Sequence, residues 1–313
     1  MNTTSPYISI VIPAFNEGLG IKRTIKHVTN VISECQVDWE IIVIDDGSAD
    51  DTYQQLCDLS QDDAHIKAIK LSRNFGKESA MLAGLEYANG DAIITIDSDL
   101  QHPPELMPEM IAKWQTGAQI VHAVKRTRNQ ESVAKKSAAF LINKIISGLG
   151  GINTNNSSDY KLLDKEIVDI LVHQLPEKER FFRGLTSWIG FTEAYLYFDV
   201  EERLDGESKW SFWSLLELSI TALTTFTSLP LRIVSVLGLI TLVLGFFVAG
   251  DAIWSIFEGR AVSGFATIII SILIIGSFIM ISLGIIGEYI AKIYEEVKAR
   301  PHYLIKSKVG FKK

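Results

Sequence analysis

The stretch Ala92-Ile-Ile-Thr-Ile-Asp-Ser-Asp-Leu-Gln101 joins an apolar run directly to two carboxylates. The run predicts a buried strand, and Asp97 and Asp99 follow at its carboxyl end. Residues two apart in an extended chain point to the same side, so both carboxylates can approach one divalent cation, and Gln101 adds a carbonyl oxygen. Asp-x-Asp triplets are also common at turns and helix caps. The position of this one after a strand favours a site for Mg²⁺ or Mn²⁺.

Strand and helix patterns alternate on the amino-terminal side of this stretch. The predicted strands are rich in β-branched residues and lie at Tyr7 to Ile12, which Pro13 stops, at Trp39 to Ile44 and at Ile66 to Leu71. The predicted helices have apolar residues at helical spacing and lie at Gly18 to Ser33, in a stretch ending near Leu59, and at Lys77 to Ala88. Apolar strands joined by helices indicate an α/β domain with a mostly parallel sheet.

The carboxyl ends of the predicted strands are all polar or charged. Ligands gather at these ends in open α/β sheets. The four ends are Pro13 to Glu17, Asp45 to Ser48, Ser72 to Lys77 and Asp97 to Gln101. Two common nucleotide motifs are incomplete here, because Arg23 stands where the third Gly of a G-x-G-x-x-G motif belongs and Gly76-Lys77 lacks the upstream Gly of a P-loop. The sequence therefore favours neither a dehydrogenase nor a P-loop kinase.

Composition excludes several other classes of protein. The chain has 313 residues, of which 47% are hydrophobic, with 8 Pro and 22 Gly, so it is neither disordered nor collagen-like. Its 2 cysteines, Cys35 and Cys57, show no zinc-ligand spacing and no disulfide framework. Residues 1 to 231 carry 21 Lys and Arg against 32 Asp and Glu, whereas residues 232 to 313 carry 9 against 5. This acidic first part argues against nucleic acid as a partner.

Two long apolar segments follow the acidic part. Ile233 to Gly250 is free of charges and stays apolar to about Phe257, and Val262 to Gly287 is free of charges throughout. Each is long enough to cross about 30 Å of hydrocarbon as a helix. We expect a two-helix transmembrane hairpin within residues 232 to 290, with helices at about 233–257 and 262–287; a buried hairpin of a soluble protein is the alternative.

The charges that flank the hairpin predict its orientation. Residues 291 to 313 form a basic tail, which the positive-inside rule places in the cytoplasm, at the inner membrane. A hairpin puts both termini on one side, so residues 1 to 210 are expected there as well, and the start of the chain lacks the pattern of a signal peptide. Trp210, Phe212 and Trp213 open a stretch, residues 211 to 231, that we expect to be an amphipathic helix at the headgroups; a core helix is the alternative. Phe140 to Leu149 resembles a second such surface element.

Several motifs together resemble family 2 glycosyltransferases with the GT-A fold, and within them the polyprenyl-phosphate glycosyltransferases. The amino-terminal motifs are Val11-Ile-Pro-Ala-Phe-Asn-Glu17, Asp45-Asp-Gly-Ser48, Arg73-Asn-Phe-Gly-Lys77, Gly90-Asp91 and Asp97-Ser-Asp-Leu-Gln-His-Pro-Pro-Glu105. The later ones are Asp159-Tyr-Lys-Leu-Leu-Asp164, Arg203-Leu-Asp-Gly-Glu-Ser-Lys209, Leu229-Pro-Leu-Arg232 and Gly287-Glu-Tyr289. This group includes dolichol-phosphate mannose synthase and bacterial enzymes that glycosylate undecaprenyl phosphate.

The resemblance implies a Rossmann-like GT-A domain that transfers one sugar, with inversion, from a nucleotide-sugar to a polyprenyl phosphate. A uridine donor is preferred, guanosine is possible, and glucose, N-acetylglucosamine, mannose and an amino-arabinose all fit the motifs. The implied catalytic residues are Asp97, Asp99 and Asp159, with Mg²⁺ or Mn²⁺ held by Asp97, Asp99 and Gln101. The implied substrate-binding residues are Pro13, Phe15, Glu17, Asp46, Lys77, Ser98, Arg126, Arg128, Arg203, Ser208 and Lys209, and Lys125 joins the basic cluster expected at the acceptor phosphate.

Individual residues leave alternatives open. Phe15 could equally be core packing, and Asp159 could be a base or a binder of the donor sugar. His102 is expected to be a turn residue rather than a metal ligand. The chain departs from the group at Ser98, where Ala is common, and at Lys161, where Arg is usual, so a phosphate grip there would be a point charge rather than a fork.

Two rival functions come from the same sequence. A processive polysaccharide synthase is disfavoured because a Gln-x-x-Arg-Trp motif is missing and two spans are too few to enclose a polymer channel. A non-catalytic membrane module that binds nucleotide-sugar would have no need for the cations at Arg203 and Lys209. A homo-oligomer is possible, because small residues such as Gly276 and Gly284 can pack between helices.

Overall fold

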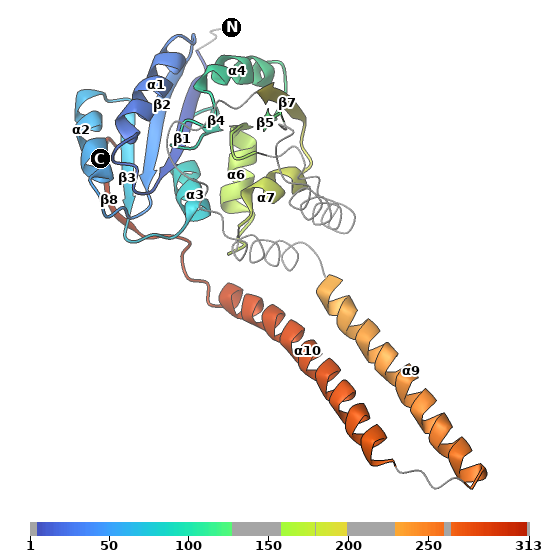
Figure 1. Cartoon of the computed structure of the whole chain (residues 1–313). Helices are drawn as coiled ribbons and strands as arrows, with labels where there is room; N and C mark the ends of the chain where they lie inside the picture. The colour runs from blue at the N-terminus through green and yellow to red at the C-terminus, as the bar shows by residue number, and fades with distance from the viewer. Residues whose placement is uncertain (1–4, 127–157, 179, 199–228, 260–263, 312–313) are drawn as a thin grey trace. The chain divides into compact units, whose positions relative to one another are not determined.

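The computed structural model describes residues 5–126, 158–178, 180–198, 229–259 and 264–311 (Figure 1). The chain divides into two compact units. One comprises Met1–Lys209 together with Arg300–Lys313, and the other comprises Trp210–Ala299. The first unit therefore combines both ends of the chain, and the second is inserted between them.

The first unit is built on an eight-stranded sheet with the order β7-β5-β6-β4-β1-β2-β3-β8. The strands are β1 (Tyr7–Ala14), β2 (Asp38–Asp45), β3 (Ile66–Leu71), β4 (Ala92–Thr95), β5 (Ile120–Lys125), β6 (Lys161–Asp164), β7 (Glu193–Phe198) and β8 (Ile305–Val309). The four central strands β4, β1, β2 and β3 are parallel, whereas β6 and β8 run antiparallel to their neighbours. The mostly parallel sheet predicted from the sequence is confirmed.

Helices cover both faces of the sheet (Figure 1). On one face lie α1 (Ile21–Ser33), α2 (Thr52–Asp62) and α4 (Met107–Gln115), which follows the short 3₁₀ helix η1 (Pro104–Leu106). On the other face lie α3 (Lys77–Tyr87), α6 (Lys165–His173) and α7 (Phe182–Trp188). The central strands are apolar on both sides because each side packs on helices.

Strand β1 continues past the point where Pro13 was expected to stop it. Pro13 lies opposite Ile44 in the parallel register with β2. The Val11 carbonyl accepts from the amide of Ile96 on the β4 side, and the Ala14 carbonyl accepts from the amide of Asp46 on the β2 side. Pro13 therefore faces the β4 side, where the pairing has already ended at Val11. Its missing N–H costs no ladder bond, so the prediction that the strand ends before Pro13 is wrong.

The carboxyl-terminal segment adds the edge strand β8 to the sheet. It pairs antiparallel with β3, Ile69 opposite Lys308 and Ala68 opposite Val309. Lys306 and Lys308 are exposed and alternate with half-buried residues, as expected of a strand with one covered face. The sequence analysis treated residues 291 to 313 as a basic tail, because a five-residue strand with two lysines carries little strand signal of its own.

The second unit contains two long helices, α9 (Leu229–Phe257) and α10 (Phe265–Val297). By length and composition Val234–Ser255 and Ile270–Val297 could each span a membrane, and neither apolar stretch is buried within the protein. Leu239, Phe246 and Met280 are among their exposed side chains. Their length, composition and exposed apolar side chains suggest that these two helices associate with a membrane. The predicted amphipathic helix lies outside the described residues, apart from Leu229 to Leu231, which begin α9, and so does Phe140 to Leu149.

Candidate functional site

The carboxyl ends of β1 and β2, the segment leading into α3 and the loop after β4 line one pocket of about 330 Å³. Eight residues singled out from the sequence line it, namely Pro13, Phe15, Glu17, Asp46, Lys77, Asp97, Ser98 and Asp99, together with Ala14, Asn74, Gly76 and Ala80. Phe15 is 44% exposed, so its ring is available at the pocket rather than packed in the core. The parallel strands thus bring together side chains that are far apart in the sequence.

Asp46 fixes the loop that leads into α3. Its carboxylate accepts hydrogen bonds from the amides of Phe75 at 2.7 Å and Gly76 at 2.9 Å. Burial raises the pKa of Asp46, and these two hydrogen bonds offset part of that rise. Gly76 has φ of +96°, which a side chain would oppose, and a Cβ on Gly47 would lie 2.4 Å from the carbonyl carbon of Arg73. The backbone at the start of α3 is therefore held in one position.

The loop after β4 carries the Asp-x-Asp triplet. The Thr24 hydroxyl of α1 donates to the carbonyl of Ser98 at 2.7 Å, and the amide of Gln101 donates to Asp99 Oδ1 at 3.1 Å. Leu100 has a left-handed backbone with φ of +55°. This turn brings His102 back towards the carboxylates, and ligand atoms of Asp97, Asp99 and His102 all lie within 4.8 Å of one another.

This donor set fits a divalent cation. Two carboxylates and one imidazole match the preferences of Mn²⁺, and the carboxylates alone suit Mg²⁺. Burial lowers the pKa of His102, which favours the neutral ring that ligates metals, although Asp97 and Asp99 oppose that shift. The expectation that His102 is only a turn residue missed this placement. A histidine three residues after the triplet, in a loop that doubles back, was the available signal.

Strand pairing places Asp159 beside Asp97. β4 and β6 are antiparallel, and their pairing ends with Thr95 opposite Lys161, so Asp97 and Asp159 both lie just beyond the same end of this pairing. There, Lys77 Nζ lies 2.6 Å from Asp97 and 2.7 Å from Asp159. The Thr95 hydroxyl donates to the carbonyl of Asp159 at 2.6 Å, which fixes the segment just before β6. The sequence linked these two aspartates only through resemblance, whereas the sheet shows why they are neighbours.

Two cations hold the Asp159 carboxylate. Lys77 Nζ lies 2.7 Å from its Oδ2 and 2.6 Å from Asp97 Oδ1. Arg183, in the first turn of α7, donates through Nε to Oδ1 at 2.7 Å and through its terminal nitrogen to Oδ2 at 2.8 Å. Burial by itself raises the pKa of Asp159, but the bonds and charges of Arg183 and Lys77 outweigh it and hold that pKa well below its usual range. Asp159 is therefore ionised and a weak base.

Arg183 is not among the residues predicted from the sequence. It lies in Phe181-Phe-Arg-Gly184, outside the motifs that carry the resemblance. A single arginine within an apolar segment was the available signal, because a buried or half-buried guanidinium needs a carboxylate partner.

Lys161 lies beneath this cluster rather than in the pocket. Its side chain is fully buried and donates to the Thr186 hydroxyl of α7 at 2.7 Å. Burial lowers its pKa to about 7. Glu78 is its acidic counterpart: burial, with the charge of Asp159, raises its pKa to about 7, and its carboxylate accepts from the Phe182 amide at 3.2 Å. The strand turns the Lys161 side chain into the core, so Lys161 does not line the pocket.

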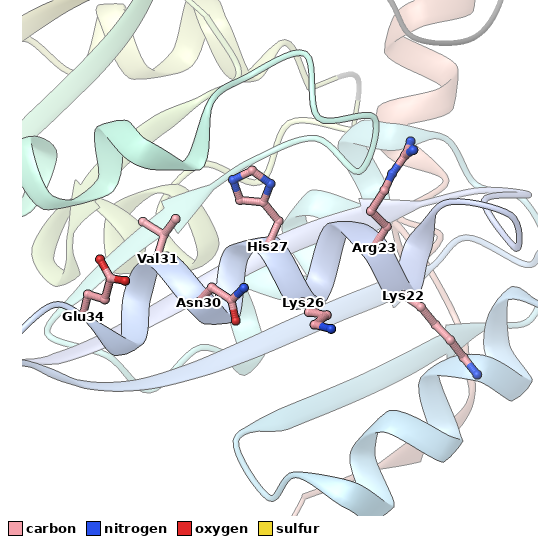
Figure 2. Close-up of a pocket in the computed structure, with 7 residues that line it drawn as sticks. All are labelled: Lys22, Arg23, Lys26, His27, Asn30, Val31 and Glu34. Carbon is pink, nitrogen blue, oxygen red and sulfur yellow. The ribbon is translucent and has the colours of Figure 1, made fainter.

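Of the expected acceptor-side cations, the two that the structure describes do not line this pocket. Lys125 ends β5 and Arg126 follows it; both are exposed, and neither lines the pocket. Arg128, Arg203, Ser208 and Lys209 lie outside the described residues. A separate open hollow lies along one face of α1 and is lined by Lys22, Arg23, Lys26, His27, Asn30, Val31 and Glu34 (Figure 2). Six of them come from α1 and Glu34 caps its carboxyl end, so among the described residues no other element lines this hollow.

The chain is similar to known glycosyltransferases. Residues 9–170 match the glycosyl transferase family 2 profile. An uncharacterized glycosyltransferase of Synechocystis is 41% identical over 95% of this chain and 94% of its own length. A prophage bactoprenol glucosyl transferase homolog of Escherichia coli is 36% identical over 96% of this chain and 98% of its own length. Among solved structures, glucosyl-3-phosphoglycerate synthase from Mycobacterium tuberculosis with Mn²⁺, UDP-glucose and phosphoglyceric acid has a TM-score of 0.48 at 21% identity, covering 70% of this chain and 78% of that one.

The family match covers more than half of the chain, and the relatives match almost all of it. The sheet order, the strand-end pocket and the Asp-x-Asp loop are those expected of a GT-A domain. The chain is a glycosyltransferase, and it belongs to glycosyl transferase family 2.

Proposed function

We propose that this glycosyltransferase moves one sugar, with inversion, from a nucleotide-sugar to a polyprenyl phosphate at the cytoplasmic face of the inner membrane. The observation that carries the transfer is the pocket itself, where Asp97 and Asp99 meet His102, Lys77 and Asp159 at the strand ends. The polyprenyl acceptor is supported by the full-length similarity to proteins named bactoprenol glucosyl transferases, because bactoprenol is a polyprenol. UDP-glucose is the first donor to test, on the same ground.

The donor would lie across the strand ends. Phe15 offers an exposed ring to the nucleoside, and Pro13, Glu17 and Asp46 line the same side of the pocket. A divalent cation held by Asp97, Asp99 and either Gln101 or His102 would supply positive charge to the departing diphosphate. The carboxylates are positioned for this by the β4 loop, which Thr24 holds through Ser98.

Asp159 acts in this proposal as an anchor for cations rather than as a general base. Its pKa is held far below neutrality, so it takes up a proton poorly. A phosphate monoester has a second pKa of about 6 and is mostly dianionic at neutral pH, so the attacking oxygen needs no base. Through its bonds to Arg183 and Lys77, Asp159 would hold positive charge near the reacting phosphates. Lys125, Arg126, Arg128, Arg203, Ser208 and Lys209 remain proposed contacts for the acceptor.

Chain connectivity supports a membrane arrangement with two crossings. Residues on both sides of the two-helix unit belong to the same compact unit, and β8, after the second helix, pairs with β3. We therefore propose that the chain crosses the membrane twice and that both flanks of the helices lie on one side of it. The basic residues after α10 favour the cytoplasmic side. The segment 211–231 is proposed to lie along the interface, near the lipid phosphate.

A transfer assay tests the proposal. The purified full-length chain is incubated with undecaprenyl phosphate and, in turn, each of a panel of UDP- and GDP-sugars. The product is extracted into organic solvent, and its molecular mass is determined by mass spectrometry. We expect one sugar added to the lipid phosphate, from one donor, with the anomeric configuration inverted. A water-soluble polymer would identify a processive synthase instead, and donor binding without any lipid product across the panel would identify a non-catalytic module.

A further inference from the structure

Lys77 holds one of the two oxygen atoms that Asp97 can offer to a metal ion. Its ammonium lies 2.6 Å from Asp97 Oδ1, and the other oxygen of Asp97 lies 3.7 Å from His102 Nδ1. Asp97 belongs to the group of three side chains whose ligand atoms lie within 4.8 Å of one another. An ammonium and a divalent cation are both positive and compete for the same carboxylate lone pairs. Lys77 and a cation therefore cannot both hold Asp97 Oδ1 at these distances.

The Lys77 side chain can leave without disturbing its surroundings. Its backbone is at the start of α3, where Asp46 holds the amides of Phe75 and Gly76. The side chain itself is 41% exposed and lines the open pocket, so its flexible stem can turn without a change in the helix. Asp159 does not depend on it for its position, because Arg183 grips that carboxylate through two bonds of 2.7 and 2.8 Å.

The pocket also offers the displaced ammonium a destination. Lys77 lines the same pocket as Asn74, Gly76 and the two aspartates of the β4 loop. A diphosphate bound to a cation on that loop would lie in this pocket. Its remaining negative charge would attract an ammonium that has just lost Asp97.

We propose that Lys77 is a placeholder for the divalent cation: it holds Asp97 in the ligand-free chain, is displaced when the cation binds, and then pairs with the donor diphosphate. This inference rests on the proposed metal-dependent transfer and adds an order to it. The ligand-free site keeps its carboxylates neutralised and in place, and the cation gains its full affinity only when the nucleotide gives Lys77 a new partner. Cation and donor then bind cooperatively.

Metal binding, measured without turnover, tests the placeholder. Free Mn²⁺ is followed by electron paramagnetic resonance during titration of the full-length chain, with and without saturating UDP. The proteins are the wild type, Lys77→Gln, the charge-conserving Lys77→Arg, and Lys26→Gln, which removes one positive charge from an exposed position of α1 (Figure 2). Melting temperatures of the variants establish that each is folded.

Without nucleotide, we expect Lys77→Gln to bind Mn²⁺ at least about tenfold more tightly than the wild type, since no ammonium has to be displaced. Lys77→Arg and Lys26→Gln are expected to stay close to the wild type. UDP should then raise the Mn²⁺ affinity of the wild type more than that of Lys77→Gln, because only the wild type gains the new ion pair.

The contrary outcomes separate this inference from the proposed function. Equal or weaker Mn²⁺ binding by Lys77→Gln overturns the placeholder and leaves the metal site standing. An equal gain from UDP in both proteins overturns the pairing of Lys77 with the diphosphate. Absence of Mn²⁺ binding by every protein, with and without UDP, overturns the metal site of the proposed function and the inference with it.

Discussion

The two ends of the parallel strands both pair carboxylates with a lysine, and they do so for different purposes. At the amino ends, Glu40 is fully buried and accepts from the Ser9 hydroxyl at 2.6 Å and the Asn89 amide at 2.9 Å, besides its ion pair with Lys67. Its pKa is lowered: burial raises it, and these three partners more than offset that rise. Protein groups satisfy this carboxylate, so the pair stabilises the fold.

At the carboxyl ends of the strands, the corresponding carboxylate and lysine remain accessible to ligands. The side chains of Asp97 and Lys77 are 24% and 41% exposed, and they border a pocket of about 330 Å³. Carboxylates gathered in one place repel one another unless cations neutralise them. The protein supplies those cations only in part, through Lys77 and Arg183, and leaves oxygen atoms accessible for ligands. The comparison shows that a structural ion pair and a ligand site differ in how many protein groups satisfy the carboxylate, not in which residue types they contain.

The largest effect on activity is expected at the carboxyl ends of the strands, which we call the open end because its carboxylates are accessible. Asp99→Asn keeps an oxygen for the Gln101 amide but removes a negatively charged ligand from an exposed position. We expect sugar transfer to fall by roughly 10²- to 10³-fold while the melting temperature stays unchanged. Product formation with Mg²⁺ or Mn²⁺ and thermal unfolding check this together. Retention of wild-type transfer would remove Asp99 from the metal site.

At the amino ends of the strands, where protein groups satisfy Glu40, we expect the opposite pattern, a loss of stability without a loss of activity. Glu40→Gln leaves the ammonium of Lys67 without its charge partner in a largely buried position. Breaking such a pair costs about 3 kcal/mol of stability, so we expect a clearly lower melting temperature and a near-normal rate per folded molecule. Unfolding in denaturant and the transfer rate of the folded fraction measure the two. A lower transfer rate with an unchanged free energy of unfolding would mean that the amino ends of the strands also serve the reaction.

A smaller, pH-dependent effect is expected at Glu78, beneath the open end. Its folded-state pKa of about 7 lies above its ordinary value of 4.5, so the folded chain holds this proton more tightly than the unfolded chain. Ionisation of Glu78 then lowers stability progressively from about pH 4.5 to pH 7, and by a constant amount above. Glu78→Gln keeps an oxygen for the Phe182 amide and cannot ionise. It should stabilise the protein by about 2 kcal/mol at pH 8 and hardly at all at pH 5. Melting curves at the two pH values check this, and an equal difference at both would contradict it.

The smallest effect is expected at Arg183. Arg183→Lys keeps the charge beside Asp159 but loses the two-bond grip through Nε and the terminal nitrogen. We expect transfer to fall by about tenfold with little change in stability, because looser cations stabilise the reacting phosphates less well. Steady-state rates at saturating donor measure it. Arg183→Met, which removes the positive charge, serves as the comparison and is expected to lose more transfer activity. An equal loss of transfer activity in both variants would contradict a role for the charge at this position.

Much of the fold could be predicted because local patterns agree with burial. The apolar residues Ile21, Ile25, Val28 and Ile32 predicted α1, and all four are buried against the sheet. Strand β3 has the predicted bounds, since both of its faces meet hydrophobic groups. Pro13 misled the prediction because whether its missing N–H costs a ladder bond depends on where the pairing of β1 with β4 ends. Strand β8 is fixed by a partner more than 200 residues away, which no local pattern shows.

The site residues likewise fall into those that the sequence could predict and those that it could not. Asp97 and Asp99 follow a strand directly, so their alignment at its end could be predicted from the sequence. The position of Asp159 depends on the antiparallel register of β4 and β6, and that of Arg183 on how α7 packs against them. His102 depends on a left-handed turn at Leu100. These placements are set by tertiary packing, which sequence spacing does not encode.

The central claim is that a divalent cation on the β4 loop holds the donor diphosphate. The most direct measurement is the ³¹P hyperfine coupling of Mn²⁺ bound to the full-length chain with UDP. We predict coupling to phosphorus in the wild type, with the protein-bound signal lost in Asp99→Asn. Protein-bound Mn²⁺ without phosphorus coupling, or an unchanged signal in Asp99→Asn, would contradict the claim.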